Sequence, residues 1–170
     1  MNILAICIVV SVVILVAGAV YVTKMVMEAK AKIAALENGK KSQSVTLPLR
    51  LQAYERMALF LERIDPNQLV LRIHAAGLTI SQEQNLLLMA IRSEFEHNIS
   101  QQIYLSDAVW QRVCEAKSDI ESIITTVAAD YDKDADSREF AETLLSVAAE
   151  KPVVEMAIHI LKADMQKWAY

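Results

Sequence analysis

An uncharged, apolar run at the amino terminus constrains this chain more than any other feature of its sequence. Residues 3–23 contain no charged side chain, and the apolar residues are interrupted only by Ser11, Gly18, Tyr21 and Thr23. As an α-helix, these 21 residues span about 31 Å, which matches the roughly 30 Å hydrocarbon core of a bilayer. The run therefore predicts a transmembrane anchor at residues 1–23 that contacts membrane lipid through residues 3–23.

A cleaved signal peptide is the alternative interpretation of this run, because residues 17–19 (Ala-Gly-Ala) look like a small-residue cleavage site. Only Met1 and Asn2 precede the apolar residues, so the basic region that begins a signal peptide is missing. We therefore favour an uncleaved anchor. Residues 24–44 carry five lysines and two glutamates. By the positive-inside rule, they predict a single-pass protein of the inner membrane with its amino terminus outside and its carboxy-terminal domain in the cytoplasm.

Residues 24–44 are predicted to form a juxtamembrane helix that ends at Gly39, followed by a polar linker. Eight apolar residues share one phase with a 3–4 spacing: Val12, Leu15, Ala19, Val22, Val26, Ala29, Ile33 and Leu36. This stripe is a candidate seam for self-association. Inside a membrane span almost every face of a helix is apolar, so the spacing there says little. Only the four stripe residues beyond residue 23 therefore support a seam. Residues 24–41 are also basic enough to contact anionic lipid, although the acidic domain that follows would be repelled by the same surface.

Residues 45–170 are predicted to form one cytoplasmic helical domain. The chain has three Gly and three Pro, fewer than the turns of an all-β fold need. Helix starts are expected at Thr46 with Pro48, Asp65 with Pro66, a capping box of Ser81 and Gln84, Ser106, and Asp136 or Ser137. The expected ends are near Ile64, Gly77 and Ile103 for the first three helices, and Lys151-Pro152 separates the last two. The predicted fold class is all-α: an N-terminal transmembrane helix with a juxtamembrane extension, then a compact bundle of about six helices.

The domain carries no motif of catalysis, cofactor binding or metal binding. Aspartates alternate over residues 130–136, but neither possible calcium-loop register supplies Gly at position 6 and Glu at position 12. His74, His97 and His159 fall on separate predicted helices without a metal-binding motif. The domain has 12 Lys and Arg against 19 Asp and Glu, and a net charge of −7 disfavours nucleic acid. We therefore predict no catalytic residue, no cofactor, no metal and no nucleic-acid partner.

The helix expected over residues 46–64 has an unusual polar face. Its arginines alternate with Glu55 and Glu62, and Tyr54 lies beside the apolar stripe. Arg and Tyr are enriched at interface hot spots, whereas ion pairs that support a solvated helix are the simpler explanation. The interface candidates are Arg50, Tyr54, Arg56 and Arg63, with Arg92, Glu94 and His97 as second choices.

Several segments resemble a family of short, membrane-anchored, uncharacterised proteins of Bacteroidetes-type bacteria. The segments that carry the resemblance are Leu47-Pro48, residues 51–56, 61–64, Pro66, 69–72, 91–98, 101–104, Ser106-Asp107 and Trp110. The resemblance implies the same layout of anchor, linker and helical domain over the whole chain. It implies no activity, so no functional residue is carried over from it.

Together these features predict a non-enzymatic scaffold or accessory subunit that acts through its cytoplasmic domain. Its partner is expected to be another protein or a second copy of the chain. The alternative is a small-molecule sensor or an enzyme with a pocket between helices, which a ligand that raises the melting temperature would reveal.

Overall fold

The computed structural model describes residues 3–169 of the chain, with side chains described over 15–33 and 46–167. These residues form six α-helices and one 3₁₀-helix, and no β-strand occurs among them. The chain divides into two units, Met1–Thr46 and Leu47–Tyr170. The division lies two residues beyond the predicted start of the domain at residue 45.

The first helix, α1, spans Ile3–Ile64. It continues through residues 39–44, so the prediction of a helix end at Gly39 and a polar linker is wrong. One glycine in a helix interior costs only about 1 kcal/mol, which good helix formers on both sides offset. Pro48 therefore lies inside α1 instead of near its start, where it removes one backbone hydrogen bond.

Where the side chains are described, no helix has both the length and the apolar character that crossing a membrane requires. The predicted span over residues 3–23 lies partly outside the described side chains, which begin at residue 15. All of the side chains described over residues 15–33 are exposed.

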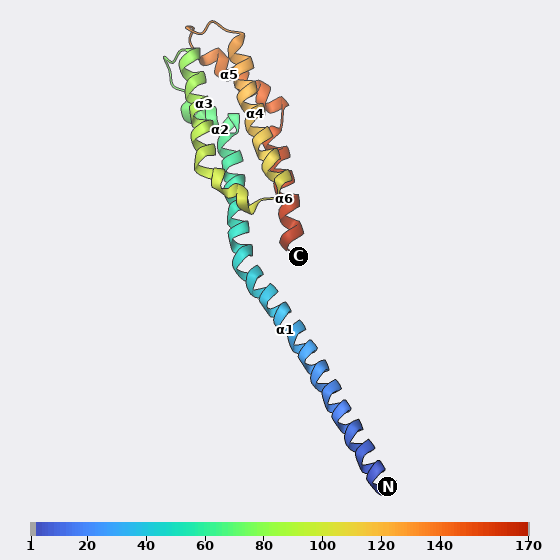
Figure 1. The fold of residues 1–170 in the computed structure, drawn as a ribbon. Coiled ribbons are helices and arrows are strands. Elements are labelled where there is room, and N and C mark those ends of the chain that lie inside the picture. Colours follow the sequence, from blue (N-terminus) through green and yellow to red (C-terminus); the bar gives the residue numbers. More distant parts are fainter. Residues whose placement is uncertain (1–2, 170) are drawn as a thin grey trace. The chain divides into compact units, whose positions relative to one another are not determined.

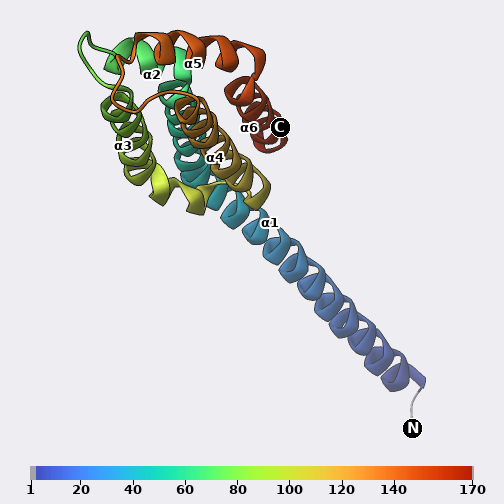
Figure 2. The same ribbon diagram turned by 90° about the horizontal axis from the view of Figure 1, so that it is seen from above.

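The second unit is a helical bundle that begins with the last part of α1. It continues with α2 (Pro66–Ile73), α3 (Ile80–Asn98), the 3₁₀-helix η1 (Ile99–Tyr104), α4 (Asp107–Ala129), α5 (Arg138–Glu150) and α6 (Val153–Ala169). Helix α4 contacts α3, α5 and α6, and α2 packs beside α5 at one end of the bundle (Figures 1 and 2).

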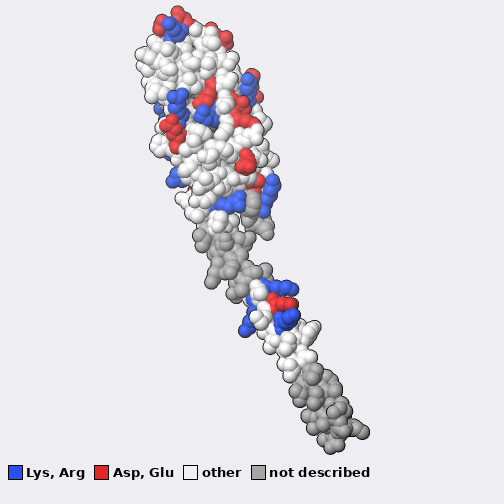
Figure 3. Space-filling model, in the orientation of Figure 1, with Lys and Arg blue, Asp and Glu red and all other residues white. Residues whose placement is uncertain are grey.

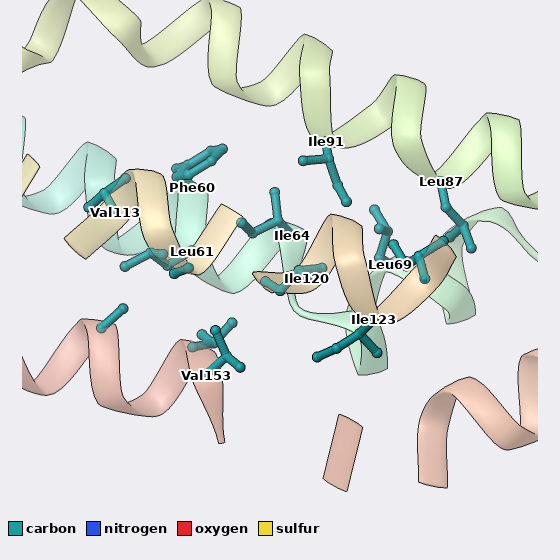
Figure 4. Close-up of a cluster of buried hydrophobic side chains, with 14 of the residues drawn as sticks. Phe60, Leu61, Ile64, Leu69, Leu87, Ile91, Val113, Ile120, Ile123 and Val153 are labelled. Carbon is teal, nitrogen blue, oxygen red and sulfur yellow. The ribbon is translucent and has the colours of Figure 1, made fainter. Parts of the chain in front are cut away.

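The core of this unit forms where apolar stripes of the helices meet. Figure 4 shows Ile64 of α1, Ile91 of α3 and Ile120 of α4 pointing toward one another. All three are almost completely buried, as are Leu69 of α2 and Leu144 of α5. The all-α bundle predicted from the sequence is confirmed.

Side-chain caps define the starts of α2, α3 and α4. Asp65 caps α2, with its carboxylate accepting the Asn67 N–H at 2.8 Å, and Ser106 caps α4, as predicted. Helix α2 ends at Ile73, four residues before the predicted stop at Gly77, which adopts a positive φ of 86° in the following turn. Helix α3 ends at Asn98, and η1 replaces the predicted continuation to Ile103.

The start of α3 differs from the prediction. Its capping box consists of Thr79 and Gln82 instead of Ser81 and Gln84. The backbone N–H groups of Ile80 and Ser81 donate to the carbonyls of Ala135 and Lys133. The loop between α4 and α5 therefore satisfies two donors at the start of α3, and this fixes where the helix begins.

Candidate functional site

A groove between α1 and α3 brings together four of the predicted interface residues. On α1, Ala53, Met57, Phe60 and Ile64 face the core. Because positions three and four residues apart share a face of a helix, the stripe from Gln52 through Arg63 faces outward. The groove lies between this stripe and the carboxy-terminal part of α3.

The groove has a volume of about 440 Å³. Helix α1 contributes Gln52, Glu55, Arg56, Leu59, Phe60 and Arg63, and α3 contributes Ser93, Glu94, His97 and Asn98. Residues 52–63 extend over about 16 Å of helix, so the groove follows α1 for about three turns.

Polar contacts order the α3 side of the groove. The Arg63 guanidinium donates from Nη1 to both carboxylate oxygens of Glu94, at 3.0 and 3.1 Å. His97 Nδ1 lies 2.6 Å from the Ser93 carbonyl, so this nitrogen is the donor. Asn98 donates to the Glu94 carbonyl at 2.8 Å. The exposed Arg63–Glu94 pair contributes about 1 kcal/mol at most to stability, so a ligand can compete for it.

Among the described residues that line the groove, Arg56 is the arginine without an ion pair. Its side chain is exposed, and it makes no hydrogen bond or ion pair with another described residue. Leu59 lies one turn further along the same stripe, with 54% of its surface exposed. A cation and an apolar side chain are therefore available on one face of α1.

An aromatic cluster supports the groove from within the domain. The rings of Phe60 and Phe95 are 5.8 Å apart, and Phe95 stacks on Trp110 at 5.5 Å. The Lys117 ammonium lies 5.3 Å from the centre of the Phe95 ring. Since these residues come from α1, α3 and α4, the cluster holds the two helices of the groove at a fixed spacing.

A second hollow, of about 390 Å³, lies beside the groove between α1 and α2. Arg63 lines both hollows. Arg72 of α2 donates to the Arg63 carbonyl at 3.2 Å, and the neighbouring Leu71 is 78% exposed. The two hollows thus form one surface around Arg63, with Leu59 and Leu71 as its exposed apolar residues.

The other three predicted interface residues lie outside the groove. Tyr54 is only 3% exposed, so its burial contradicts the expectation of a surface contact. Arg50 donates from Nε to the Tyr104 carbonyl at 3.2 Å. Arg92 is exposed on α3 but does not line the groove.

Tyr54 belongs to a buried polar network that the sequence analysis missed. Its hydroxyl donates to Asp164 Oδ2 at 2.6 Å, Ser106 donates to the same oxygen at 2.8 Å, and Lys167 donates to Oδ1 at 3.4 Å. Burial opposes the ionisation of Asp164, but these hydrogen bonds outweigh it and hold the pKa of Asp164 below its usual 3.8. Burial and the hydrogen bond to Asp164 raise the pKa of Tyr54 from 10.0 to about 12. The network joins α1, α4 and α6.

Glu83 is a second buried polar group that sequence reasoning missed. Its side chain is fully buried, and Oε2 lies 2.9 Å from His74 Nδ1. Its other oxygen has no hydrogen-bond partner among the described residues. Within the part of the chain that the structure describes, no group of three or more His, Cys, Asp or Glu could hold a metal ion.

Comparison with known proteins identifies a family. Residues 1–168 match the model of a Family of unknown function (DUF7935). No curated protein and no solved structure gives a significant match. Since the match covers almost the whole chain, and since the resemblance noted above was to an uncharacterised family, the chain belongs to the family of unknown function DUF7935.

Proposed function

We propose that this chain is a non-enzymatic scaffold or accessory subunit whose groove between α1 and α3 binds a helical segment of a protein partner. The observation that carries the proposal is the convergence of Arg56, Arg63, Glu94 and His97 on one groove beside the exposed Leu59. Sequence reasoning selected these four residues without knowing that the two helices are neighbours.

The chemistry of the groove defines the partner segment. A groove that follows α1 for about three turns suits an amphipathic helix, which binds such a surface through apolar residues three or four positions apart. Its apolar residues would contact Leu59 and Leu71, and a carboxylate beside them would pair with Arg56. Lys and Arg are mixed with Asp and Glu over the face of the domain in Figure 3, so the specificity is local to these side chains.

The proposal also places the chain in the inner membrane of a Bacteroidetes-type bacterium as a single-pass protein. The uncharged run over residues 3–23 and the excess of lysine over residues 24–44 support this placement. The amino terminus would lie outside and the helical domain in the cytoplasm. The partner would then be a cytoplasmic protein or the cytoplasmic part of a membrane complex.

Affinity purification of the full-length tagged protein from gently solubilised membranes tests the binding proposal. The double substitution Arg56→Glu and Arg63→Glu should remove a partner that the natural protein retains in stoichiometric amount. A matched control reverses two exposed charges outside the groove, Lys133→Glu and Arg138→Glu, and should retain it. A photo-crosslinking residue at position 59 should join the same partner, whereas one at the exposed position 142 should not. Equal recovery from both double variants would exclude the groove as the binding site.

Membrane fractionation tests the anchoring separately. The protein should stay with the membrane pellet after an alkaline carbonate wash, and protease added to intact spheroplasts should leave the domain uncut. Mass spectrometry of the purified chain should show Met1–Tyr170 without cleavage near residues 17–19. Release by carbonate would overturn the anchor, and a shortened amino terminus would establish the signal peptide.

A further inference from the structure

Over residues 15–33, the helix that precedes the domain carries an apolar stripe that no described residue of its own unit covers. Leu15, Val22, Val26 and Ile33 on this stripe have between 46% and 72% of their surfaces exposed. Ala19 and Ala29, at the intermediate positions, are also exposed. Apolar residues that recur at alternating intervals of three and four form a heptad seam, which a second helix covers.

The residue types along the seam indicate the number of helices that it joins. The first apolar position of each heptad holds Val12, Ala19, Val26 and Ile33, and the second holds Leu15, Val22, Ala29 and Leu36. In parallel coiled coils, β-branched residues at the first position with leucine at the second favour two helices over three or four. Three of the four first positions are β-branched, and leucine stands at two of the four second positions.

Charges beside the seam are complementary in the same arrangement. Lys32 takes the last position of its heptad and Glu37 the fifth position of the next. In a parallel pair these two positions face each other across the seam, so position 32 of one copy, a lysine, lies opposite position 37 of the other, a glutamate. The two-fold symmetry of a homodimer forms this pair twice.

We infer that a second copy of this chain covers the stripe, and that residues 12–36 of the two copies pair as a parallel coiled coil. The direction rests on the proposed anchoring, because two chains inserted into one membrane with the same topology run parallel. Inside the membrane the pairing depends on close packing at Ala19. Beyond it, the burial of Val26 and Ile33 adds a hydrophobic contribution.

Disulfide crosslinking of the full-length protein in native membranes tests the seam. In a background with Cys7→Ala and Cys114→Ala, single cysteines are introduced at each position from 26 to 33 and oxidised. Crosslinked dimer should peak at positions 26, 29 and 33, at least about fivefold above positions 28 and 31, because only cysteines at the seam approach closely enough to bond. A flat profile, or a maximum at positions 28 and 31, would overturn the inference.

Charge exchange provides an independent measurement, made by energy transfer between labelled copies reconstituted in lipid vesicles. Lys32→Glu or Glu37→Lys alone should weaken dimerisation about tenfold, since each converts two attractive pairs into repulsive ones. The double variant Lys32→Glu, Glu37→Lys should restore it. Failure of the double variant to recover would overturn the parallel register.

The outcomes separate this inference from the proposed anchoring. A chain that leaves the membrane in carbonate yet crosslinks at positions 26, 29 and 33 would lack the anchor and keep the dimer. A chain that stays in the membrane with a flat crosslinking profile would keep the anchor and exclude the dimer.

Discussion

Replacing Tyr54 with phenylalanine tests the energetic role of the buried network that joins α1, α4 and α6. The substitution removes one hydroxyl and leaves the ring, so it creates no large cavity. The lost hydrogen bond is 2.6 Å long, lies in the buried interior and ends on a carboxylate. Hydrogen bonds to charged groups contribute about 1.5–3 kcal/mol. Since Asp164 keeps Ser106 and Lys167 as donors, we expect a loss of about 2 kcal/mol at pH 7.

The same bond predicts a loss of stability in alkali. Below pH 10 the Tyr54 hydroxyl is neutral in the folded and the unfolded chain, and its full contribution is present. As the pH rises from 10 toward 12, the unfolded chain ionises while the folded chain keeps its proton, because its pKa is raised to about 12. The free energy of unfolding should therefore fall over this interval by about 2 kcal/mol. The free energy of unfolding of the Tyr54→Phe variant should not show this decrease.

Urea unfolding of the full-length protein in detergent, followed by tryptophan fluorescence at pH 7 to 12, measures both effects. The difference in absorbance at 295 nm between the natural protein and Tyr54→Phe reports the titration of Tyr54 itself. Tyr131→Phe is the matched control, because its hydroxyl makes a half-buried bond to the neutral hydroxyl of Thr143 and should cost only about 1 kcal/mol. Equal stability of the natural protein and Tyr54→Phe, or parallel curves between pH 10 and 12, would refute the reasoning.

Three further substitutions test the described fold by thermal or urea unfolding. Ile64→Ala should cost about 3 kcal/mol, because it opens a cavity where α1, α3 and α4 meet, and a loss below 1 kcal/mol would contradict the packing of this core. Thr79→Ala should cost about 1 kcal/mol through loss of the capping box, and Ser81→Ala should cost much less, since Thr79 and Gln82 form the box. A larger loss of stability for Ser81→Ala than for Thr79→Ala would instead support the capping box predicted at Ser81 and Gln84. Gly77→Ala should cost about 1 kcal/mol from backbone conformation alone, because its φ is 86° and no atom lies within 4 Å of an added Cβ.

The sequence predicted the start of a helix correctly where the contacts that fix it come from neighbouring residues. Asp65 and Pro66 start α2 because the Asp65 carboxylate bonds two residues ahead. At the start of α3, however, Thr79 with Gln82 and Ser81 with Gln84 offer the same local pattern. The choice depends on backbone bonds to residues 133 and 135, which lie more than fifty positions away and leave no trace in the local sequence.

The candidate site was predictable only in its residue types. The repeat of Arg and Glu on α1 and the residues from Glu94 to His97 on α3 were selected separately, and only the fold makes them neighbours. Tyr54 was misassigned because a polar group beside an apolar stripe looks the same whether it faces solvent or a buried carboxylate. A signal for its partner was present, since Asp164 lies three residues after the buried Leu161, on the apolar face of α6.

The bond between Tyr54 and Asp164 also sets an order of events during synthesis. Its two residues lie 110 positions apart in the chain. At the pace of about 5–20 residues per second at which chains are made, Tyr54 is complete about 5–20 s before its carboxylate exists. Until α6 is made, the Tyr54 hydroxyl lacks the carboxylate to which it donates in the folded domain. A chain that stops before α6 therefore lacks one of the two ends of the network that joins α1, α4 and α6.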